Sequence, residues 1–320
     1  MISIISETGD VSSNEVIEYL LSFKKDFKRY NVENQSLFTI SINNNTLNLP
    51  FKNTFHRRAR LNTLSNDQKN SIFRDYLKNE ENPVIKSLEY IAKKENHNYV
   101  GEYNDEEQHN KIIDLYIAKN AGLKIPKTIV SNKQSDIQDF FYDCEKKIIT
   151  KCIKYPLNIR LQNSSIVGKN TFFVKQKDIK TLTQINSLGI YQEYIEKQVE
   201  IRAFFYKDKI FPMAIFSQQN KKTKIDYREY DEENPNRYVP YKLPINIEEK
   251  IRLFCVNKNI NTGSIDIILD HKDNYIFLEN NPQGQFEWVS KSCNYYIEKF
   301  IAEDLVNHEE ESVINLFKKQ

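Results

Sequence analysis

The segment 263–288, GSIDIILDHKDNYIFLENNPQGQFEW, constrains the fold more than any other part of the chain. Two short apolar runs flank the polar sequence DHKDN, and this pattern predicts an antiparallel β-hairpin. Glu279 and Asn281 are two residues apart, so an extended strand places both side chains on one face. Asp266 lies on the partner strand, where it can point the same way. The hairpin therefore predicts that three oxygen-bearing side chains converge.

Two carboxylates and an amide oxygen form a hard ligand set that suits Mg²⁺ bound to nucleotide phosphates. The alternative is that acidic residues near a hairpin turn are merely solvated. However, Asp266 lies between Ile265 and Ile267, and Glu279 follows Leu278. A carboxylate among apolar neighbours needs a partner to offset its desolvation, and a cation is one such partner. On these residues alone, both interpretations stay open.

The sequence around Asp266, together with FLENNPQGQFEW, resembles the carboxyl-terminal metal-binding hairpin of the ATP-grasp ligases. The continuation NPQGQF is similar to that of the ATP-grasp peptide maturases that make graspetides, the microviridin type and especially the grasp-with-spasm type. The opening MISIISETGDVSSNEVIEYL is similar to the start of the same family, so the resemblance covers nearly the whole chain. It implies that Asp266, Glu279 and Asn281 hold Mg²⁺ on the phosphates of ATP.

The chain has 320 residues, enough for two or three packed units, and its 46 basic and 44 acidic residues nearly balance. A net charge of +2 gives no reason to expect a nucleic-acid partner, although the basic cluster 56–60 is a candidate anion site. The four cysteines lack the spacing of a zinc knuckle or a disulfide framework, which indicates a reducing compartment. The sequence shows no signal peptide and no apolar run long enough to span a membrane. We therefore expect a cytoplasmic protein without a membrane partner.

Apolar residues 2–6 and the amphipathic segment 13–27 predict a strand followed by a helix, the start of an α/β unit. A hairpin is expected within 37–49, a helical region at 65–94 and a strand at 98–102. The resemblance implies an α/β lead-in domain and two α+β lobes that clamp ATP. The predicted domains are the lead-in domain 1–103, the central lobe 104–189 and the carboxyl-terminal lobe 190–320.

Two lysines are candidates for contacts with phosphate. Lys111 begins a predicted helix, and Lys151 emerges from the apolar strand KKIITKCIKY, where it can deliver a point charge to phosphate oxygens. The resemblance makes Lys151 the principal lysine on the α and β phosphates and gives Lys111 a further phosphate contact. The alternative for Lys111 is an exposed lysine without a function. The phosphate-covering loop of the family should follow within 155–171, where Gly168 is the single glycine.

The strand-like sequence IYQEY precedes a pair of charged residues, Glu200 and Arg202, which share one face of a predicted strand. The resemblance assigns Glu200 to the ribose hydroxyls and Arg202 to the charge that develops on the transferred phosphate. An exposed ion pair of little value is the alternative. The resemblance also implies a hinge that holds the adenine, formed by Gln192, Glu193, Tyr194 and Ile195.

Asp226 and Arg228 match the DxR pattern of graspetide ligases, in which the arginine is implied to grip the carboxylate of the substrate. The planar fork of arginine suits that role, and a solvated loop pair is the alternative. Residues 231–244, rich in Pro and Asn, are expected to form a mobile connection. Helices are expected at 247–257 and 293–306.

The resemblance implies a ligase that uses Mg²⁺ and ATP to macrocyclise a ribosomally made precursor peptide with a leader and a core. An Asp or Glu side chain of the peptide is phosphorylated, and a Ser or Thr hydroxyl or a Lys amine then displaces phosphate to give an ω-ester or ω-amide. The implied catalytic residues are Arg202, Asp226 and Arg228, and a homodimer is implied as well.

Two other functions remain open. The first is an ATP-grasp ligase that joins a free amino acid or amine to a carboxylate, against which the DxR triplet and NPQGQF argue. The second is an ATP-binding regulator without turnover, against which the complete ligand set and both lysines argue. The residues by themselves support Mg²⁺-nucleotide chemistry on a carboxylate.

Overall fold

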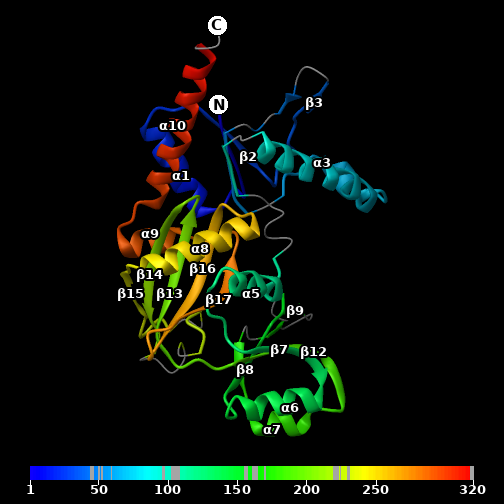
Figure 1. Cartoon of the computed structure of the whole chain (residues 1–320). Coiled ribbons are helices and arrows are strands. Elements are labelled where there is room, and N and C mark those ends of the chain that lie inside the picture. Colours follow the sequence, from blue (N-terminus) through cyan, green and yellow to red (C-terminus); the bar gives the residue numbers. More distant parts are fainter. Residues whose placement is uncertain are drawn as a thin grey trace.

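The computed structural model describes residues 1–43, 47–49, 51, 53–58, 60–95, 98–101, 109–154, 158–160, 165–168, 171–218, 223, 225–228 and 231–317. Within these residues, three larger β-sheets follow one another along the molecule (Figure 1). An amino-terminal sheet lies at one end, a five-stranded sheet lies in the middle, and a second four-stranded sheet lies at the other end. None of the described helices has the length and apolar character needed to cross a membrane.

The amino-terminal sheet is parallel, in the order β2-β1-β5-β6. Its strands are β1 (Ile2–Ser6), β2 (Phe27–Asn31), β5 (Asn53–His56) and β6 (Asn98–Val100). The other elements of this unit are α1 (Val11–Ser22), the short hairpin β3 (Ser41–Ile42) and β4 (Leu47–Asn48), α2 (Asn66–Lys69) and α3 (Arg74–Lys94). The α/β character expected of the lead-in domain is confirmed. The turn of the predicted hairpin lies mostly outside the described residues.

Helix α1 is shorter than the sequence pattern predicts. Asp10 caps its start by accepting a hydrogen bond from the backbone N–H of Ser13 at 2.7 Å. Lys24 adopts a φ of 55°, and the N–H of Lys25 bonds to the carbonyl of Leu20, which is how helices commonly close. The helix thus ends at Ser22, and the segment predicted to be helical as far as residue 27 turns into β2.

The second four-stranded sheet has the order β11-β8-β12-β7, with antiparallel neighbours. Its strands are β7 (Thr128–Lys133), β8 (Ile148–Lys151), β11 (Thr171–Val174) and β12 (Ile185–Glu193). Its face is covered by α6 (Gln134–Asp143) and α7 (Gln176–Thr181), which pack a small core against it. Between β8 and β11, the strands β9 (Asn158–Arg160) and β10 (Ser165–Val167) pair antiparallel within the segment predicted to cover the phosphates.

The middle sheet is antiparallel, in the order β15-β14-β13-β16-β17. Its strands are β13 (Lys197–Tyr206), β14 (Lys209–Phe216), β15 (Arg237–Pro240), β16 (Thr262–Asp270) and β17 (Tyr275–Asn281). The helices α5 (Lys111–Asn120) and α8 (Ile245–Lys258) pack on one face, and α9 (Glu287–Cys293) packs near the other. Both faces of β13 are therefore buried, and the predicted hairpin of β16 and β17 is confirmed.

Two expectations for the carboxyl-terminal part are wrong. The stretch 231–244, expected to be a mobile connection, contains β15, which pairs with β14 along four residues. The last helix does not run unbroken from residue 293. Asn294 and Tyr296 adopt φ values of 53° and 52°, which separate α9 from α10 (Ile297–Phe317). The predicted boundary between residues 189 and 190 falls inside β12, and the domain division as a whole remains a prediction.

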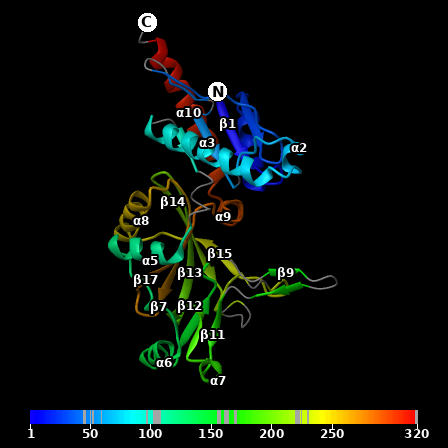
Figure 2. The same cartoon turned by 90° about the vertical axis from the view of Figure 1, so that its right-hand side faces the viewer.

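The last helix returns to the first part of the chain. In Figure 1, α10 runs beside α1, and Figure 2 shows α10 near the amino terminus. The side chain of Asn53 in β5 donates a hydrogen bond to the carbonyl of Leu305 at 2.8 Å. Nearby, the fully buried Phe286 packs its ring against Phe55 of β5 and Phe204 of β13. The amino-terminal sheet is thereby joined to the middle sheet through the end of the predicted metal-binding segment.

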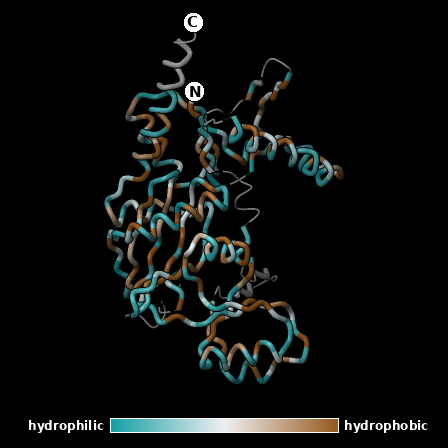
Figure 3. Tube along the Cα trace, viewed as in Figure 1, coloured by the Kyte–Doolittle hydropathy of each residue, from teal (hydrophilic) through white to brown (hydrophobic). Residues whose placement is uncertain are grey.

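We predict that Phe286→Ala lowers the free energy of unfolding by about 3 to 5 kcal/mol, because it opens a cavity between the two sheets. The matched control is Phe73→Ala at the hydrophobic outer end of α3 (Figure 3), where the Phe73 side chain is 61% exposed. That change should alter stability by less than about 0.5 kcal/mol. Urea unfolding measures both values. Equal effects of the two substitutions would contradict the packing described here.

Candidate active site

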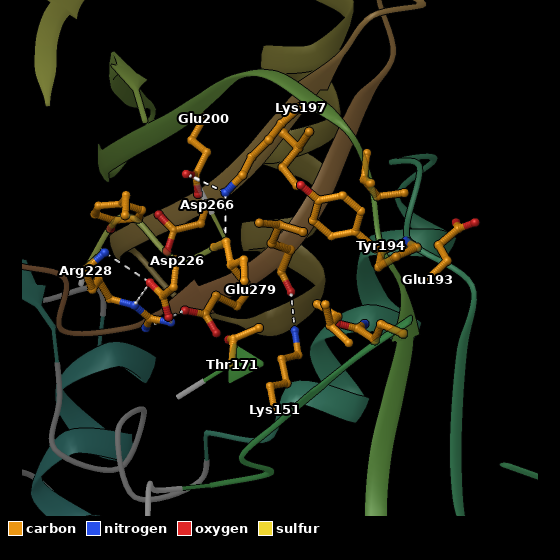
Figure 4. A pocket seen from close by; sticks show the side chains of 18 residues that line it. Lys151, Thr171, Glu193, Tyr194, Lys197, Glu200, Asp226, Arg228, Asp266 and Glu279 are labelled. Atoms are coloured by element: carbon orange, nitrogen blue, oxygen red, sulfur yellow. Dashed lines mark hydrogen bonds and ion pairs between the residues drawn. The ribbon is translucent and has the colours of Figure 1, made fainter. Parts of the chain in front are cut away.

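A cleft with an open volume of about 680 Å³ lies between the middle sheet and the sheet that contains β8 and β12 (Figure 4). Charged and apolar side chains from both sheets line it. The polar residues among them are Lys151, Thr171, Gln192, Glu193, Lys197, Glu200, Asp226, Arg228, Asp266 and Glu279. Nearly all the residues predicted to bind a nucleotide or a metal thus face one space.

The three predicted metal ligands lie side by side. Asp266 of β16 pairs with Glu279 of β17, and the side chain of Asn281 donates a hydrogen bond to Asp266 at 3.1 Å. A bulge makes this possible, because Ile267 pairs with Phe277 and the register then skips Leu278. If the register continued from Phe277 without a bulge, Leu278 would pair with Asp266, and Glu279 would point with Ile265 to the opposite, apolar face of the sheet. The bulge therefore brings both carboxylates to the cleft.

Cationic side chains surround these carboxylates. Arg202 of β13 lies opposite Asp266 and donates to its two oxygens at 2.9 and 2.8 Å. Glu279 is 3.2 Å from Nη1 of Arg228 and 3.5 Å from Nζ of Lys111. The described part of the chain holds no group of three His, Cys, Asp or Glu side chains placed to bind a metal. The observed set, two carboxylates and one amide, instead suits an ion that takes its remaining ligands from water and phosphate.

Burial and charge act in opposite directions on the two carboxyls. Burial opposes the ionisation of Glu279, yet the charges of Arg228, Lys151 and Lys111 lower its pKa to about 2. Burial raises the pKa of Asp266 above its ordinary value, although Arg202 counteracts part of this effect. Glu279 is thus the more firmly ionised of the pair.

Lys151 is a buried cation at the end of β8. Its Nζ is 3.5 Å from the carbonyl oxygen of Leu278, the residue that the bulge inserts, and it forms no ion pair with a described residue. Burial lowers the pKa of Lys151 to about 8, and the negative charge of Glu279 offsets this effect only in part. The site therefore favours an added anion next to Lys151.

Lys111 is not an idle surface residue. Its side chain is 12% exposed and donates to the carbonyl of Cys152 at 3.0 Å, in addition to its approach to Glu279. Lys111 thus reaches Glu279 directly, and the charge of Lys151 acts on the same carboxylate. A ligand with several negative charges would be attracted to this position.

The predicted hinge lines the inner end of the cleft with its four residues, Gln192, Glu193, Tyr194 and Ile195. The N–H groups of Glu193 and Tyr194 already donate to the carbonyls of Lys127 and Lys147. Among the described residues, no backbone acceptor is bonded to the N–H of Ile195. Apolar walls stand beside it, formed by Pro126, Ile149, Ile268 and Leu278. An apolar slot with one free donor suits a flat heteroaromatic ring.

Glu200 and Arg202 are both buried, so the exposed ion pair considered as an alternative is wrong. Glu200 accepts hydrogen bonds at 2.7 Å from Lys197 and from the hydroxyl of Ser217. Its burial raises its pKa, and Lys197 lowers it in part. Glu200 is therefore held in one position beside the hinge, where a polar group of a ligand could meet it.

Arg228 is already engaged by the protein. Its Nε and Nη2 atoms donate to the two oxygens of Asp226, each at 2.8 Å, and its Nη1 donates to Glu279. The side chain is 38% exposed while Asp226 is buried. The pair of guanidinium donors that was predicted to bind a substrate carboxylate thus faces Asp226.

A second cleft, with an open volume of about 960 Å³, adjoins the first and shares Arg228 and Glu279 with it. The residues that line only this cleft include Arg58, His109, Lys154 and 282–285. The sequence predicts Arg58 only as a member of the basic cluster 56–60, a candidate anion site. It gave no signal for His109, because a lone histidine before a helix has no distinctive pattern.

No protein-family model matches the chain, and no curated protein matches it significantly. A RiPP-associated ATP-grasp ligase from Chryseobacterium gregarium, in complex with ADP and a leader and core peptide, has a TM-score of 0.80 and 24% identity over 96% of both chains. The macrocyclase MdnC from Microcystis aeruginosa MRC, bound with precursor peptide MdnA, has a TM-score of 0.74 and 26% identity over 96% of this chain and 99% of that chain. An ATP-grasp RimK domain protein from Sphaerobacter thermophilus DSM 20745 has a TM-score of 0.54 and 9% identity over 95% of this chain and 99% of that chain. The ATP-grasp fold implied by the sequence is confirmed.

We predict that the buried charge of Lys151 lowers the free energy of unfolding of the ligand-free protein below pH 8. Its pKa falls from 10.5 to about 8 on folding, so between these values the unfolded chain binds more protons and stability rises with pH. Lys151→Met should remove this rise, which is on the order of 2 kcal/mol, whereas Lys177→Met on the exposed surface should retain it. Denaturant unfolding at pH 7 and pH 10 measures the difference. Parallel pH profiles of the wild type and Lys151→Met would contradict the assignment.

Proposed function

We propose that this chain, which has the fold of the ATP-grasp ligases that act on ribosomally made peptides, is an ATP-dependent peptide macrocyclase. One observation carries the proposal: Asp266, Glu279 and Asn281 converge beside Lys151 and Lys111 where a cleft that ends in an apolar slot meets the second cleft. The macrocyclase MdnC supports the peptide substrate, since it is 26% identical over nearly the full length of both chains.

The cleft fits ATP in one orientation. The base would occupy the apolar slot beside the N–H of Ile195, and Glu200 would accept a hydrogen bond from the ribose. Lys151 and Lys111 would meet the phosphates, where each lysine adds a positive charge without a covalent bond. This placement runs in one direction, from the apolar slot beside Ile195 past Glu200 and Lys151 to Lys111, which lines the second cleft.

Mg²⁺ fits the outer part of this arrangement. Asp266, Glu279 and Asn281 would hold the ion, because their oxygens form the hard set that it prefers. When bound, Mg²⁺ neutralises phosphate charge and helps to orient the phosphoryl group for transfer. Arg202, which now neutralises Asp266, would be left to stabilise the negative charge on the transferred group.

The proposed reaction has two steps. An oxygen of an Asp or Glu side chain of the peptide attacks the γ-phosphorus of ATP, and ADP leaves. A Ser or Thr oxygen or a Lys nitrogen of the same peptide then attacks the acyl carbon, and phosphate leaves with the loss of one proton from the nucleophile. The chain supplies position and charge rather than a nucleophile of its own.

The free amino-acid ligase is less well supported. The solved ligases with TM-scores of 0.80 and 0.74 are each bound to a peptide, a leader and core peptide in one and a precursor peptide in the other. A precursor peptide with a leader and a core is the proposed partner. A homodimer, the absence of nucleic-acid and membrane partners and a cytoplasmic location stay predictions.

The proposal predicts the products. Incubation of the wild type with Mg²⁺, ATP and a synthetic peptide encoded beside this gene should release ADP and phosphate, and each crosslink should lower the peptide mass by about 18 Da. Chromatography of the nucleotides and mass spectrometry of the peptide measure both. Stoichiometric AMP and pyrophosphate would exclude the proposed route, and an unmodified peptide with free glutamate consumed would favour the amino-acid ligase.

Glu279→Gln should reduce ADP formation by at least about a hundredfold, because the amide keeps the shape but removes the charge that faces Mg²⁺. The control is Glu196→Gln, since Glu196 forms an exposed ion pair with Lys147 away from the metal set. Circular dichroism checks that both variants fold. Normal turnover by a folded Glu279→Gln protein would contradict the assignment of Glu279 as a ligand of Mg²⁺.

A further inference from the structure

The second cleft is the space that remains once a nucleotide occupies the first. The two clefts join at Glu279 and Arg228, which line both. With ATP placed as proposed, its γ-phosphate would lie at this junction, next to Lys111 and the ligands of Mg²⁺. The peptide would therefore reach the transferred phosphoryl group through the second cleft, and its acyl phosphate would form there.

The second step of the proposed reaction needs a proton acceptor, because a hydroxyl or an amine loses a proton as it attacks the acyl carbon. Apart from cations, amides, Pro282 and Gly284, the described lining of the second cleft consists of the Glu279 carboxylate and the His109 imidazole. Glu279 is assigned to Mg²⁺, and a carboxylate bound to a cation is a weak base. Histidine is the side chain best suited to take up and release a proton near neutral pH. His109 is therefore the candidate acceptor.

His109 lies at the start of α5. The next residue, Asn110, caps this helix, since its side chain accepts hydrogen bonds from two backbone N–H groups of the first turn at 3.0 and 3.2 Å. On the other side of Asn110, Lys111 approaches Glu279 at 3.5 Å and lines the same cleft. The cap thus fixes the backbone from which the imidazole and the ammonium group enter one space.

A buried carboxylate holds the imidazole. Nε2 of His109 lies 3.1 Å from Oδ2 of Asp114, whose side chain is fully buried in α5. The other oxygen of Asp114 lies 2.7 Å from Nζ of Lys258, in the last turn of α8. The negative charge next to Nε2 favours the tautomer that carries its proton there, so Nδ1 keeps its lone pair in the neutral ring. No hydrogen bond joins Nδ1 to a described residue, and this nitrogen is available to a substrate.

We propose that His109 is the general base of the second step and that Asp114 positions its ring. This inference rests on the proposed function. As the hydroxyl oxygen or amine nitrogen of the peptide bonds to the acyl carbon, its proton passes to Nδ1 of His109, and the bond from that carbon to the phosphate oxygen breaks. The charge of Asp114 stabilises the imidazolium that forms. The imidazolium then gives the proton to the departing phosphate, which restores the neutral ring.

Hydroxylamine separates the two steps, because it attacks an acyl phosphate without help from a protein base and gives a hydroxamate. The full-length protein is incubated with Mg²⁺, ATP and the peptide of the product assay, and mass spectrometry measures rings and hydroxamates. His109→Gln should form rings at least about a hundredfold more slowly than the wild type, because the general base is lost. With hydroxylamine present, its hydroxamate and ADP should form within about threefold of the wild-type rates, since phosphoryl transfer does not use His109.

Two further variants separate a base from a charge or a structural contact. Asp114→Asn should slow ring formation by at least about tenfold and spare the hydroxamate, because the amide no longer fixes the tautomer of His109. His109→Lys places a positive charge at the same position but lacks the imidazole. It should form rings as slowly as His109→Gln does.

The matched control is His271→Gln. His271 is exposed in the turn between β16 and β17 and lines neither cleft. This variant should form rings and hydroxamate at the rates of the wild type. Hydroxamate formation also reports that each variant is folded and binds the nucleotide.

Three outcomes would overturn the inference. The first is ring formation by His109→Gln at the wild-type rate. The second is an equal loss of rings and hydroxamate, which would assign His109 to phosphoryl transfer or to folding. The third is normal ring formation by His109→Lys, which would show that a positive charge suffices. Failure of the proposed function is distinct, because the wild type would then form neither ADP nor hydroxamate.

Discussion

Two buried carboxylates that face each other across β16 and β17 set the requirements for the rest of the site. Asp266 and Glu279 repel each other, and burial opposes the ionisation of both. Arg202, Arg228 and Lys111 come from three different elements to neutralise them. The two carboxylates are therefore paired with cationic side chains in the ligand-free protein. A nucleotide with its metal would replace some of these ion pairs when it binds.

The turn 281–284 connects this network to the amino-terminal sheet. The N–H of Gly284 bonds to the carbonyl of Asn281, and a side chain at Gly284 would collide with the hydroxyl of Ser264 at 2.2 Å. Glycine is thus required for the turn to lie flat on β16. Arg57 then ties the turn to the amino-terminal sheet, and its guanidinium lies 5.1 Å from the ring centre of Phe286. This packing gives a physical reason for most of the sequence NPQGQF.

The sequence predicts the hairpin and its three ligands because apolar alternation and the spacing of Glu279 and Asn281 are local features. It does not reveal the bulge at Leu278, since an inserted apolar residue reads like the continuation of a strand. Strand β15 is missed because its pairing with β14 depends on distant residues while its own neighbours resemble a loop. The contact of Arg228 with Glu279, which is 51 residues away, cannot be read from the sequence for the same reason. Which arginine faces which carboxylate is decided by tertiary contacts.

The most direct test of this replacement of ion pairs by a metal uses Mn²⁺ in place of Mg²⁺. In the ligand-free protein, Asp266 and Glu279 are neutralised by arginine and lysine, so Mn²⁺ should bind weakly. Addition of ADP should draw the lysines toward phosphate and create the metal site. Electron paramagnetic resonance measures free Mn²⁺, and we predict that its signal falls only when protein and ADP are both present. Equally tight Mn²⁺ binding without ADP would contradict this account of the site.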